Sequence, residues 1–282
     1  MKYIIKKIIN YTLLIFFYLF KNTKAGLYFN NSLFNMAMSN HIKISYKNIN
    51  FQLVNPTNLI NYRIKTFHSK EPETLDWIDK FDDNSIFWDI GANIGLYSCY
   101  ASIKKNCNVF SFEPSVFNLE ILSRNIFINN LVKKITIIPL ALNNKTIASN
   151  FSMTSTELGG AMSTFNEKYG HDGNKLNTIF SYNTLGITIN DCIDYFNLQL
   201  PDYVKIDVDG IEHLILEGGK ETLINVKSIL IEVNDEFKFQ FNETKKILTN
   251  LGFKLIKKSH AEYFDFSKTS EKTTYNQIWV KE

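Results

Sequence analysis

A glycine-rich turn directly after a short apolar strand constrains the fold of this 282-residue chain more than any other feature. The strand is predicted over Ser85–Ile90, the turn is Asp89-Ile-Gly-Ala-Asn-Ile-Gly95, and a helix is predicted to follow. A strand, a tight turn and a helix in this order are typical of α/β folds that bind nucleotides. Gly91 and Gly95 let the backbone approach a ligand, and Asn93 tolerates left-handed backbone better than most residues.

Strands and helices alternate along the rest of the chain. Strands are predicted over residues 85–90, 108–112, 134–138, 203–208, 228–233, 253–256 and 276–280. Ser115 is a good N-cap for one intervening helix, and Gly252 follows another that is predicted over Glu243–Leu251. This alternation predicts an α/β fold with a mostly parallel seven-stranded sheet and helices on both faces. Ligands bind such sheets beyond the carboxyl ends of the strands.

Two segments lack this alternation. Residues 26–80 are expected to form an N-terminal cap of short strands and turns, ahead of the main domain at 81–282. Residues 139–185 are rich in Asn, Ser, Thr and Gly, and we expect a hairpin and a long loop there. Long loops at the carboxyl face of a sheet usually carry specificity, so residues 139–185 are the predicted substrate loop.

The first 25 residues form a separate apolar segment. Lys2, Lys6 and Lys7 precede the uncharged run from Ile8 to Phe20. A membrane-spanning helix needs roughly 20 apolar residues, which this run does not supply. We expect a helix that lies on a membrane surface or packs on the protein itself. A signal peptide cleaved near Ala25 and a short spanning anchor are the alternatives.

Charge and cysteine content exclude several classes of protein. The net charge of +3 and the absence of a clustered Lys/Arg stripe argue against nucleic-acid binding. Cys99, Cys107 and Cys192 have spacings that match neither a zinc site nor a C-x-x-C pair, so reduced thiols are expected. We therefore expect a cytoplasmic protein, with peripheral contact between residues 1–20 and the inner face of the membrane.

The turn at Asp89 favours a cationic ligand without phosphate. The G-x-G-x-x-G and P-loop patterns are both absent, and a carboxylate at the mouth of the turn would repel pyrophosphate. S-adenosylmethionine carries a sulfonium and an ammonium and has no phosphate. Glu113, which ends the second strand, can accept both ribose hydroxyls. NAD enzymes use an acid in the same way. The purely structural alternatives are a helix N-cap for Asp89 and an exposed turn acid for Glu113.

Over residues 85–280 the chain resembles the FkbM family of S-adenosylmethionine-dependent O-methyltransferases. Three motifs carry the resemblance, and they lie in Trp88–Tyr97, Phe112–Asn118 and Val204–Glu212. The family usually has Glu where this chain has Asp209. The resemblance implies a Rossmann-like class I methyltransferase fold. It also implies an enzyme that methylates hydroxyls of sugars, glycolipids or polyketides. The predicted cofactor-binding residues are Asp89, Gly91, Asn93, Gly95, Glu113, Pro114 and Asn118.

Charged residues in the predicted fourth strand are the catalytic candidates. Because an alcohol is a poor nucleophile, a base or a metal should assist its methylation. Lys205, Asp207 and Asp209 alternate onto one side of the strand, where burial is costly unless charges are paired. We assign Asp207 as the general base or as the residue that positions the hydroxyl. Lys205 either keeps Asp207 ionised or binds an oxygen of the substrate. Glu212 either faces the same pocket or complements a helix dipole. No metal ligand is assigned, with Mg²⁺ on Asp207, Asp209 and Glu232 as the alternative.

The expected activity is O-methylation of a hydroxyl on a sugar, glycan or glycolipid precursor, with S-adenosylmethionine as donor. An NAD-dependent oxidoreductase is the alternative enzyme class, but this chain lacks the third glycine of the motif that such enzymes use. A catalytically inactive binding module on the same fold is the non-enzymatic alternative.

Overall fold

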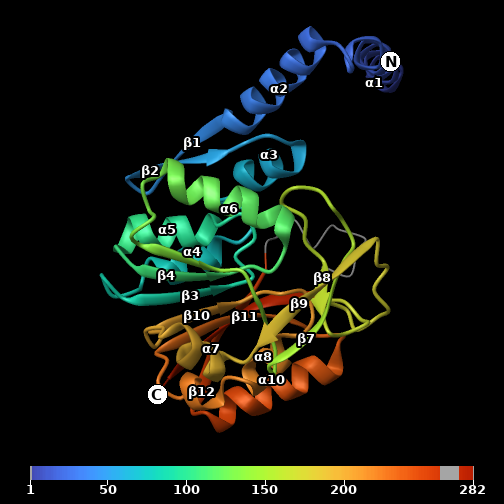
Figure 1. The fold of residues 1–282 in the computed structure, drawn as a ribbon. Coiled ribbons are helices and arrows are strands. Elements are labelled where there is room, and N and C mark those ends of the chain that lie inside the picture. Colours follow the sequence, from blue (N-terminus) through green and yellow to red (C-terminus); the bar gives the residue numbers. More distant parts are fainter. Residues whose placement is uncertain (1, 261–272, 282) are drawn as a thin grey trace.

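The computed structural model describes residues 2–260 and 273–281, and its body is a sheet between two layers of helices (Figure 1). The seven strands lie in the order β12-β13-β11-β10-β3-β4-β5. Their bounds are β3 (Ile86–Ile90), β4 (Asn108–Phe112), β5 (Ile135–Ile138), β10 (Tyr203–Ile206), β11 (Ser228–Asn234), β12 (Phe253–Ser259) and β13 (Thr274–Lys281). β13 is antiparallel to both of its neighbours, while the other pairs are parallel. The predicted mostly parallel seven-stranded sheet is confirmed.

Each face of the sheet has its own apolar core. One face is covered by α4 (Pro72–Ile78), α5 (Leu96–Lys105) and α6 (Val116–Ile128) (Figure 1). The other is covered by α7 (Ile189–Phe196), α8 (Glu212–Glu217), α9 (Lys220–Leu223) and α10 (Lys238–Asn250). Because side chains alternate along a strand, Phe87 enters the first core and Trp88 the second. Both side chains are fully buried, as in a sheet covered on two faces.

One predicted helix start and one predicted helix end are confirmed, and one predicted start is wrong. The Ser115 hydroxyl accepts the backbone N–H of Asn118 at 3.4 Å and caps α6. Gly252 follows α10 with a φ of +83°. The start predicted for α10 is wrong, because the helix begins five residues earlier, at Lys238. Gln240, in its first turn, accepts the N–H of Asn234, a tertiary contact that apolar periodicity does not reveal.

The N-terminal cap contains more helix than predicted. It consists of α2 (Lys24–Ser39), the antiparallel hairpin β1 (His41–Tyr46) and β2 (Ile49–Val54), α3 (Asn58–Lys65) and α4. Thr23 accepts the N–H of Gly26 at 3.0 Å, and Thr57 accepts that of Ile60 at 3.3 Å. Both threonines are N-caps, a signal that was present in the sequence. The prediction of strands and turns alone was therefore wrong outside the hairpin.

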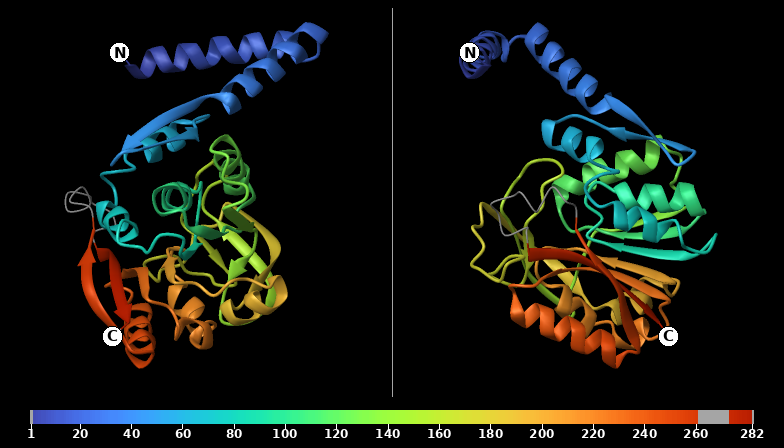
Figure 2. Two further views of the ribbon diagram at one scale, coloured as in Figure 1. Left: turned by 90° about the vertical axis from the view of Figure 1, so that its left-hand side faces the viewer. Right: turned by 180° about the vertical axis from the view of Figure 1, so that it is seen from behind.

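The first helix, α1 (Lys2–Phe20), and α2 project from the rest of the cap, away from the sheet (Figures 1 and 2). Its apolar side chains from Ile8 onward are exposed, and Phe16 packs edge-on against Phe29 of α2. The predicted helix is present and packs against α2, and its contact with a membrane surface stays a prediction. Among the described residues, no helix combines the length and the apolar content that crossing a membrane requires.

Residues 139–185 form a second, four-stranded sheet with the order β6-β9-β7-β8. Its strands are β6 (Ala141–Leu142), β7 (Ile147–Met153), β8 (Ser163–Phe165) and β9 (Phe180–Ile187). The prediction of one hairpin and a long loop missed most of this sheet, because exposed apolar side chains such as Ile147, Phe180 and Leu185 break the alternation of apolar and polar positions. The three cysteines are free and buried, as predicted.

Candidate active site

The glycine turn has the backbone geometry that its sequence predicts. Gly91, Asn93 and Gly95 have φ angles of +84°, +51° and +81°. A Cβ atom on Gly91 would lie 1.8 Å from the carbonyl oxygen of Asp207. The turn after β3 is thus pressed against the residue that follows β10, so only glycine fits there.

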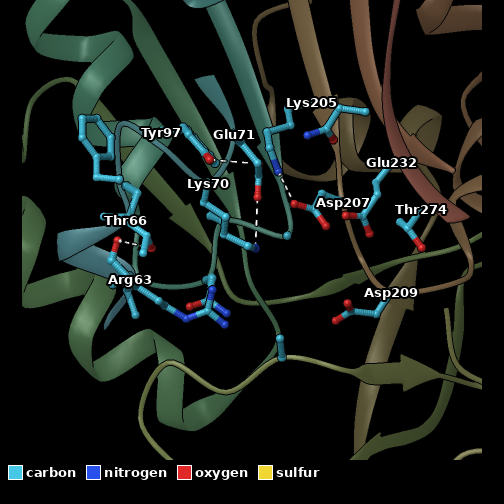
Figure 3. A pocket seen from close by; sticks show the side chains of 18 of the residues that line it. Arg63, Thr66, Lys70, Glu71, Tyr97, Lys205, Asp207, Asp209, Glu232 and Thr274 are labelled. Carbon is cyan, nitrogen blue, oxygen red and sulfur yellow. Dashed lines mark hydrogen bonds and ion pairs between the residues drawn. The ribbon is translucent and has the colours of Figure 1, made fainter. Parts of the chain in front are cut away.

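A cavity of about 330 Å³ opens beside this turn, between the cap and the carboxyl ends of β3, β10 and β11 (Figure 3). Its lining includes the turn from Gly91 to Ile94 and, from the second sheet, Met162 and His171. The charged side chains around it are Arg63, Lys70, Glu71, Glu73, Lys205, Asp207, Asp209 and Glu232. The predicted catalytic strand and the predicted substrate segment therefore meet at one cavity.

Lys205 and Asp207 form an ion pair at the floor of the cavity. Their Nζ and Oδ2 atoms are 2.6 Å apart, with Lys205 1% exposed and Asp207 24% exposed. Lys205 also lies over the ring of Tyr97, 5.2 Å from its centroid. Burial opposes the charged form of Lys205, but the carboxylates of Asp207, Glu71 and Asp89 outweigh it and raise the pKa. The predicted pair is present, although β10 ends at Ile206 and Asp207 lies just beyond the strand that was predicted to carry it.

Glu71, from the cap, joins this pair although the sequence did not point to it. The Tyr97 hydroxyl donates to its carboxylate at 2.9 Å, and Lys70 lies 3.1 Å away (Figure 3). Burial raises the pKa of Glu71, but the charges of Lys70 and Lys205 outweigh it and lower the pKa to about 2. Glu71 is therefore a permanent anion that links the cap to Lys205.

Three carboxylates gather on the opposite side of the cavity. Oxygen atoms of Asp207, Asp209 and Glu232 lie within 4.8 Å of one another. Asp209 follows the strand with a φ of +65°, and its carboxylate accepts the N–H of Met162 at 2.6 Å. Burial and the neighbouring carboxylates raise the pKa of Asp209 and of Glu232. This concentration of negative charge next to the glycine turn suits a cationic group.

Glu113 is buried at the end of β4, so the exposed-turn-acid alternative is wrong. Its two carboxylate oxygens accept the N–H groups of Asn93 at 2.7 Å and Ser115 at 2.8 Å. Burial raises its pKa to about 7. Glu113 does not line the cavity itself but holds the glycine turn that does, and each of its oxygens keeps a lone pair, which is what two ribose hydroxyls would require. The carbonyl of neighbouring Pro114 accepts the Tyr182 hydroxyl from the second sheet.

Residues 159–160 form a strap across this end of the turn. Asn118 accepts the N–H of Gly159 at 3.0 Å and donates to the Gly160 carbonyl at 3.1 Å. Asn93 donates to the same carbonyl at 2.7 Å, and Arg63 donates to the Gly159 carbonyl at 2.7 Å. Two predicted cofactor residues and one cap residue therefore hold the strap in place.

The structure corrects the position predicted for Asp89. This residue is 1% exposed, is not part of the cavity lining, and accepts a hydrogen bond from Ser98 at 2.5 Å. It pairs in register with Lys205 on the neighbouring strand. The N-cap position of α5 is occupied by Gly95, so Asp89 does not cap the helix either. The carboxylate lies behind the turn rather than at its mouth, as a counter-charge to Lys205.

The prediction that Glu212 faces the same pocket as Asp207 is also wrong. Its carboxylate accepts the N–H groups of Val208 at 3.0 Å and Gly210 at 3.1 Å, and the amide of Gln240. It is fully buried and does not line the cavity, and burial raises its pKa to about 7. Glu212 holds the loop that carries Asp209, so its role in the site is positioning.

Comparison with known proteins places this geometry in a family. Residues 89–255 match the methyltransferase FkbM domain. The chain is 23% identical over 173 residues to hexuronic acid methyltransferase AglP of Haloferax volcanii, which is 61% of this chain and 66% of that protein. The chain thus spans just under two thirds of this relative.

Two solved methyltransferases have similar chain traces. Methyltransferase FkbM from Methylobacillus flagellatus KT is 17% identical with a TM-score of 0.49, over 79% of this chain and 52% of its own. Precorrin-6y C5,15-methyltransferase from Geobacter metallireducens GS-15 is 16% identical with a TM-score of 0.43, over 75% of this chain and 87% of its own. Because the family match covers more than half of the sequence, this protein belongs to the methyltransferase FkbM family.

Proposed function

We propose that this protein is an O-methyltransferase that uses S-adenosylmethionine and acts on a hydroxyl of a sugar that carries a carboxylate. The observation that carries the proposal is the Lys205–Asp207 ion pair, which faces a cavity beside the glycine turn of a methyltransferase fold. The match to a hexuronic acid methyltransferase supports the choice of acceptor.

The residues around the turn fit the donor. Gly91 permits close approach of a ligand, and Glu113 keeps two lone pairs for ribose hydroxyls. The carboxylates of Asp209 and Glu232 match a sulfonium and an ammonium, so we assign these two to the donor rather than, together with Asp207, to Mg²⁺. When bound, S-adenosylmethionine supplies an electrophilic methyl group.

Asp207 is placed to take the proton of the acceptor hydroxyl. Lys205 bonds its Oδ2 atom, while within the described chain its other oxygen has no hydrogen-bond partner. That oxygen is available to a hydroxyl in the cavity, and the fixed ion pair holds it in one orientation. With S-adenosylmethionine bound beside the glycine turn, the ion pair would hold the acceptor hydroxyl facing the donor's methyl group. As the C–O bond forms, Asp207 receives the proton.

Arg63 is the residue that we assign to the acceptor carboxylate. It lines the cavity, and its Nε–H is fixed by the Gly159 carbonyl at 2.7 Å. Across residues 2–260 and 273–281, no carboxylate forms an ion pair with this guanidinium. Lys70, on the same wall, is close enough for the two cations to repel. A carboxylate from a ligand would relieve that repulsion and find the bidentate donors that guanidinium offers.

The test combines binding and turnover. Calorimetry is expected to show binding of S-adenosylmethionine, and release of S-adenosylhomocysteine is expected with glycosides of glucuronic or galacturonic acid but not of glucose. Stabilisation by NAD in place of S-adenosylmethionine in a melting experiment would support the oxidoreductase alternative. Donor binding without turnover on any sugar would support an inactive binding module.

The Arg63→Ala variant shows whether the guanidinium binds the carboxylate of the acceptor sugar or the carboxylate of S-adenosylmethionine. Loss of kcat/KM on uronic acids with unchanged donor affinity is the expected result, and Arg63→Lys is the matched control that keeps the charge. Loss of affinity for S-adenosylmethionine, but not for its decarboxylated analogue, would instead assign Arg63 to the donor.

A further inference from the structure

We propose that α1 and α2 form an arm that binds the surface of an anionic lipid bilayer and lies in the plane of the headgroups. The arm leaves the cap at β1 and extends away from the sheet in each view (Figures 1 and 2). This inference concerns a surface outside the cavity and does not depend on the proposed function.

The arm exposes apolar side chains on every side. In α1, Leu14 is 62% exposed and Leu19 66%; in α2, Phe34 is 60% exposed and Met36 69%. A helix that is apolar all round is normally buried in a protein core or in lipid. Within the described chain, α1 packs against α2 and its large apolar side chains from Ile8 to Phe20 stay exposed, so this apolar surface needs an occupant from outside the fold.

The arm has a defined shape. Thr23 caps α2 at the corner between the two helices. Gly26 packs so closely against the end of α1 that a Cβ atom would lie 1.8 Å from the Phe20 carbonyl oxygen. Phe16 and Phe29 join the helices with ring centroids 5.6 Å apart. The two helices therefore present one built apolar surface rather than two independent segments.

Charge identifies lipid as the occupant. Residues 1–70 contain no Asp or Glu, and five lysines lie at or near the ends of α1. They are Lys2, Lys6, Lys7, Lys21 and Lys24. A lysine near an anionic membrane surface strengthens binding by about fivefold, and dispersed lysines beside apolar side chains suit the interface. Two copies of such an arm would repel each other, because neither offers an acid to the other's lysines.

Length decides the orientation of the arm. The uncharged run spans residues 8–20, which is shorter than the roughly 20 residues that crossing a bilayer requires. The second helix contains polar asparagine and serine side chains, which suit the headgroup region. An arm at the boundary between headgroups and acyl chains suits both helices, because the apolar sides of α1 then contact lipid while the lysines at its ends reach the headgroups. The cap then holds the cavity close to the membrane surface.

Vesicle binding tests the proposal with the full chain. Co-sedimentation is expected with vesicles of phosphatidylcholine and phosphatidylglycerol, with at least tenfold weaker binding to phosphatidylcholine alone or at 0.5 M salt. Lys2→Glu/Lys6→Glu/Lys7→Glu should weaken binding by at least tenfold, and Leu14→Asp/Phe17→Asp should abolish it. Reversal of three exposed lysines outside the arm is the matched control: Lys133→Glu/Lys168→Glu/Lys245→Glu.

Melting temperature and donor affinity should stay unchanged in the arm variants, because the substituted residues lie in α1, which contributes no side chain to either core. A label on Leu14→Cys reports depth, since the native cysteines are buried. Shallow quenching by brominated lipid supports the in-plane orientation, and quenching at the bilayer centre overturns it. Absence of binding to anionic vesicles, or a dimer that the Leu14→Asp/Phe17→Asp variant converts to a monomer, overturns the lipid assignment.

Discussion

Replacement of Asp207 by Asn separates the charge of this residue from its shape. In the wild-type protein the Lys205 Nζ atom lies 2.6 Å from the Asp207 Oδ2 atom. The Asn side chain keeps an oxygen that can accept a hydrogen bond from Lys205, but it cannot take a proton from a hydroxyl. A positioned general base contributes about 10²–10⁴-fold to a rate. We therefore expect Asp207→Asn to lower kcat by about 10³-fold while the Kd of S-adenosylmethionine stays within a few fold of the wild-type value.

The same substitution has a calculable effect on stability. Removing one partner of a fully buried ion pair costs about 3–5 kcal/mol. Asp207 is 24% exposed, and Glu71 and Asp89 still face Lys205, so the expected loss is smaller, about 1–2 kcal/mol. A shift of the urea midpoint without a change in slope measures it. The variant should therefore stay folded at the temperature of the turnover assay.

Single-turnover transfer of a labelled methyl group, together with calorimetry of donor binding, is the appropriate assay. Asp209→Asn is the matched control, because it removes a carboxylate from the same cluster and keeps the acceptor for the Met162 N–H. Its turnover should stay within about tenfold of wild type, since it loses no general base. If Asp207→Asn is no slower than this control, the assignment of Asp207 as base is refuted.

Three further predictions concern the turn and the buried acids. Gly91→Ala should destabilise the fold by about 2–4 kcal/mol and abolish donor binding, because of the φ of +84° and the 1.8 Å contact with Asp207; thermal melts and calorimetry check this. Burial raises the pKa of Glu113 to about 7, and ribose binding uses its ionised form. Donor affinity should therefore rise by about tenfold from pH 6 to pH 8, with Glu113→Gln flattening the profile. Burial also raises the pKa of Glu212 from 4.5 to about 7. The folded state then holds the extra proton, so stability should fall as pH rises from 4.5 to 7 and stay low above it. Glu212→Gln should reduce this fall, as measured by urea denaturation at pH 5 and 7.5.

The sequence alone determined the sheet, the turn and one ion pair, because each depends on neighbouring residues. The positive φ angles at Gly91 and Gly95 follow from residue type. The pairing of Lys205 with Asp207 was expected from their spacing of two residues, and it is present although β10 ends at Ile206. The helix of the arm was likewise expected from an uncharged run behind lysines.

Tertiary structure alone decided which of the predicted acids face the cavity and which cap residues join them. Asp89 and Glu212 carry the expected charges, but neighbouring hydroxyl and backbone N–H groups hold them outside the cavity lining. Arg63 and Glu71 come from a segment without a motif, and they reach the site because the cap packs over the carboxyl edge of the sheet. Local periodicity encodes the direction of a side chain along its own element. The meeting of elements that lie more than 100 residues apart depends on how the apolar faces of those elements pack together.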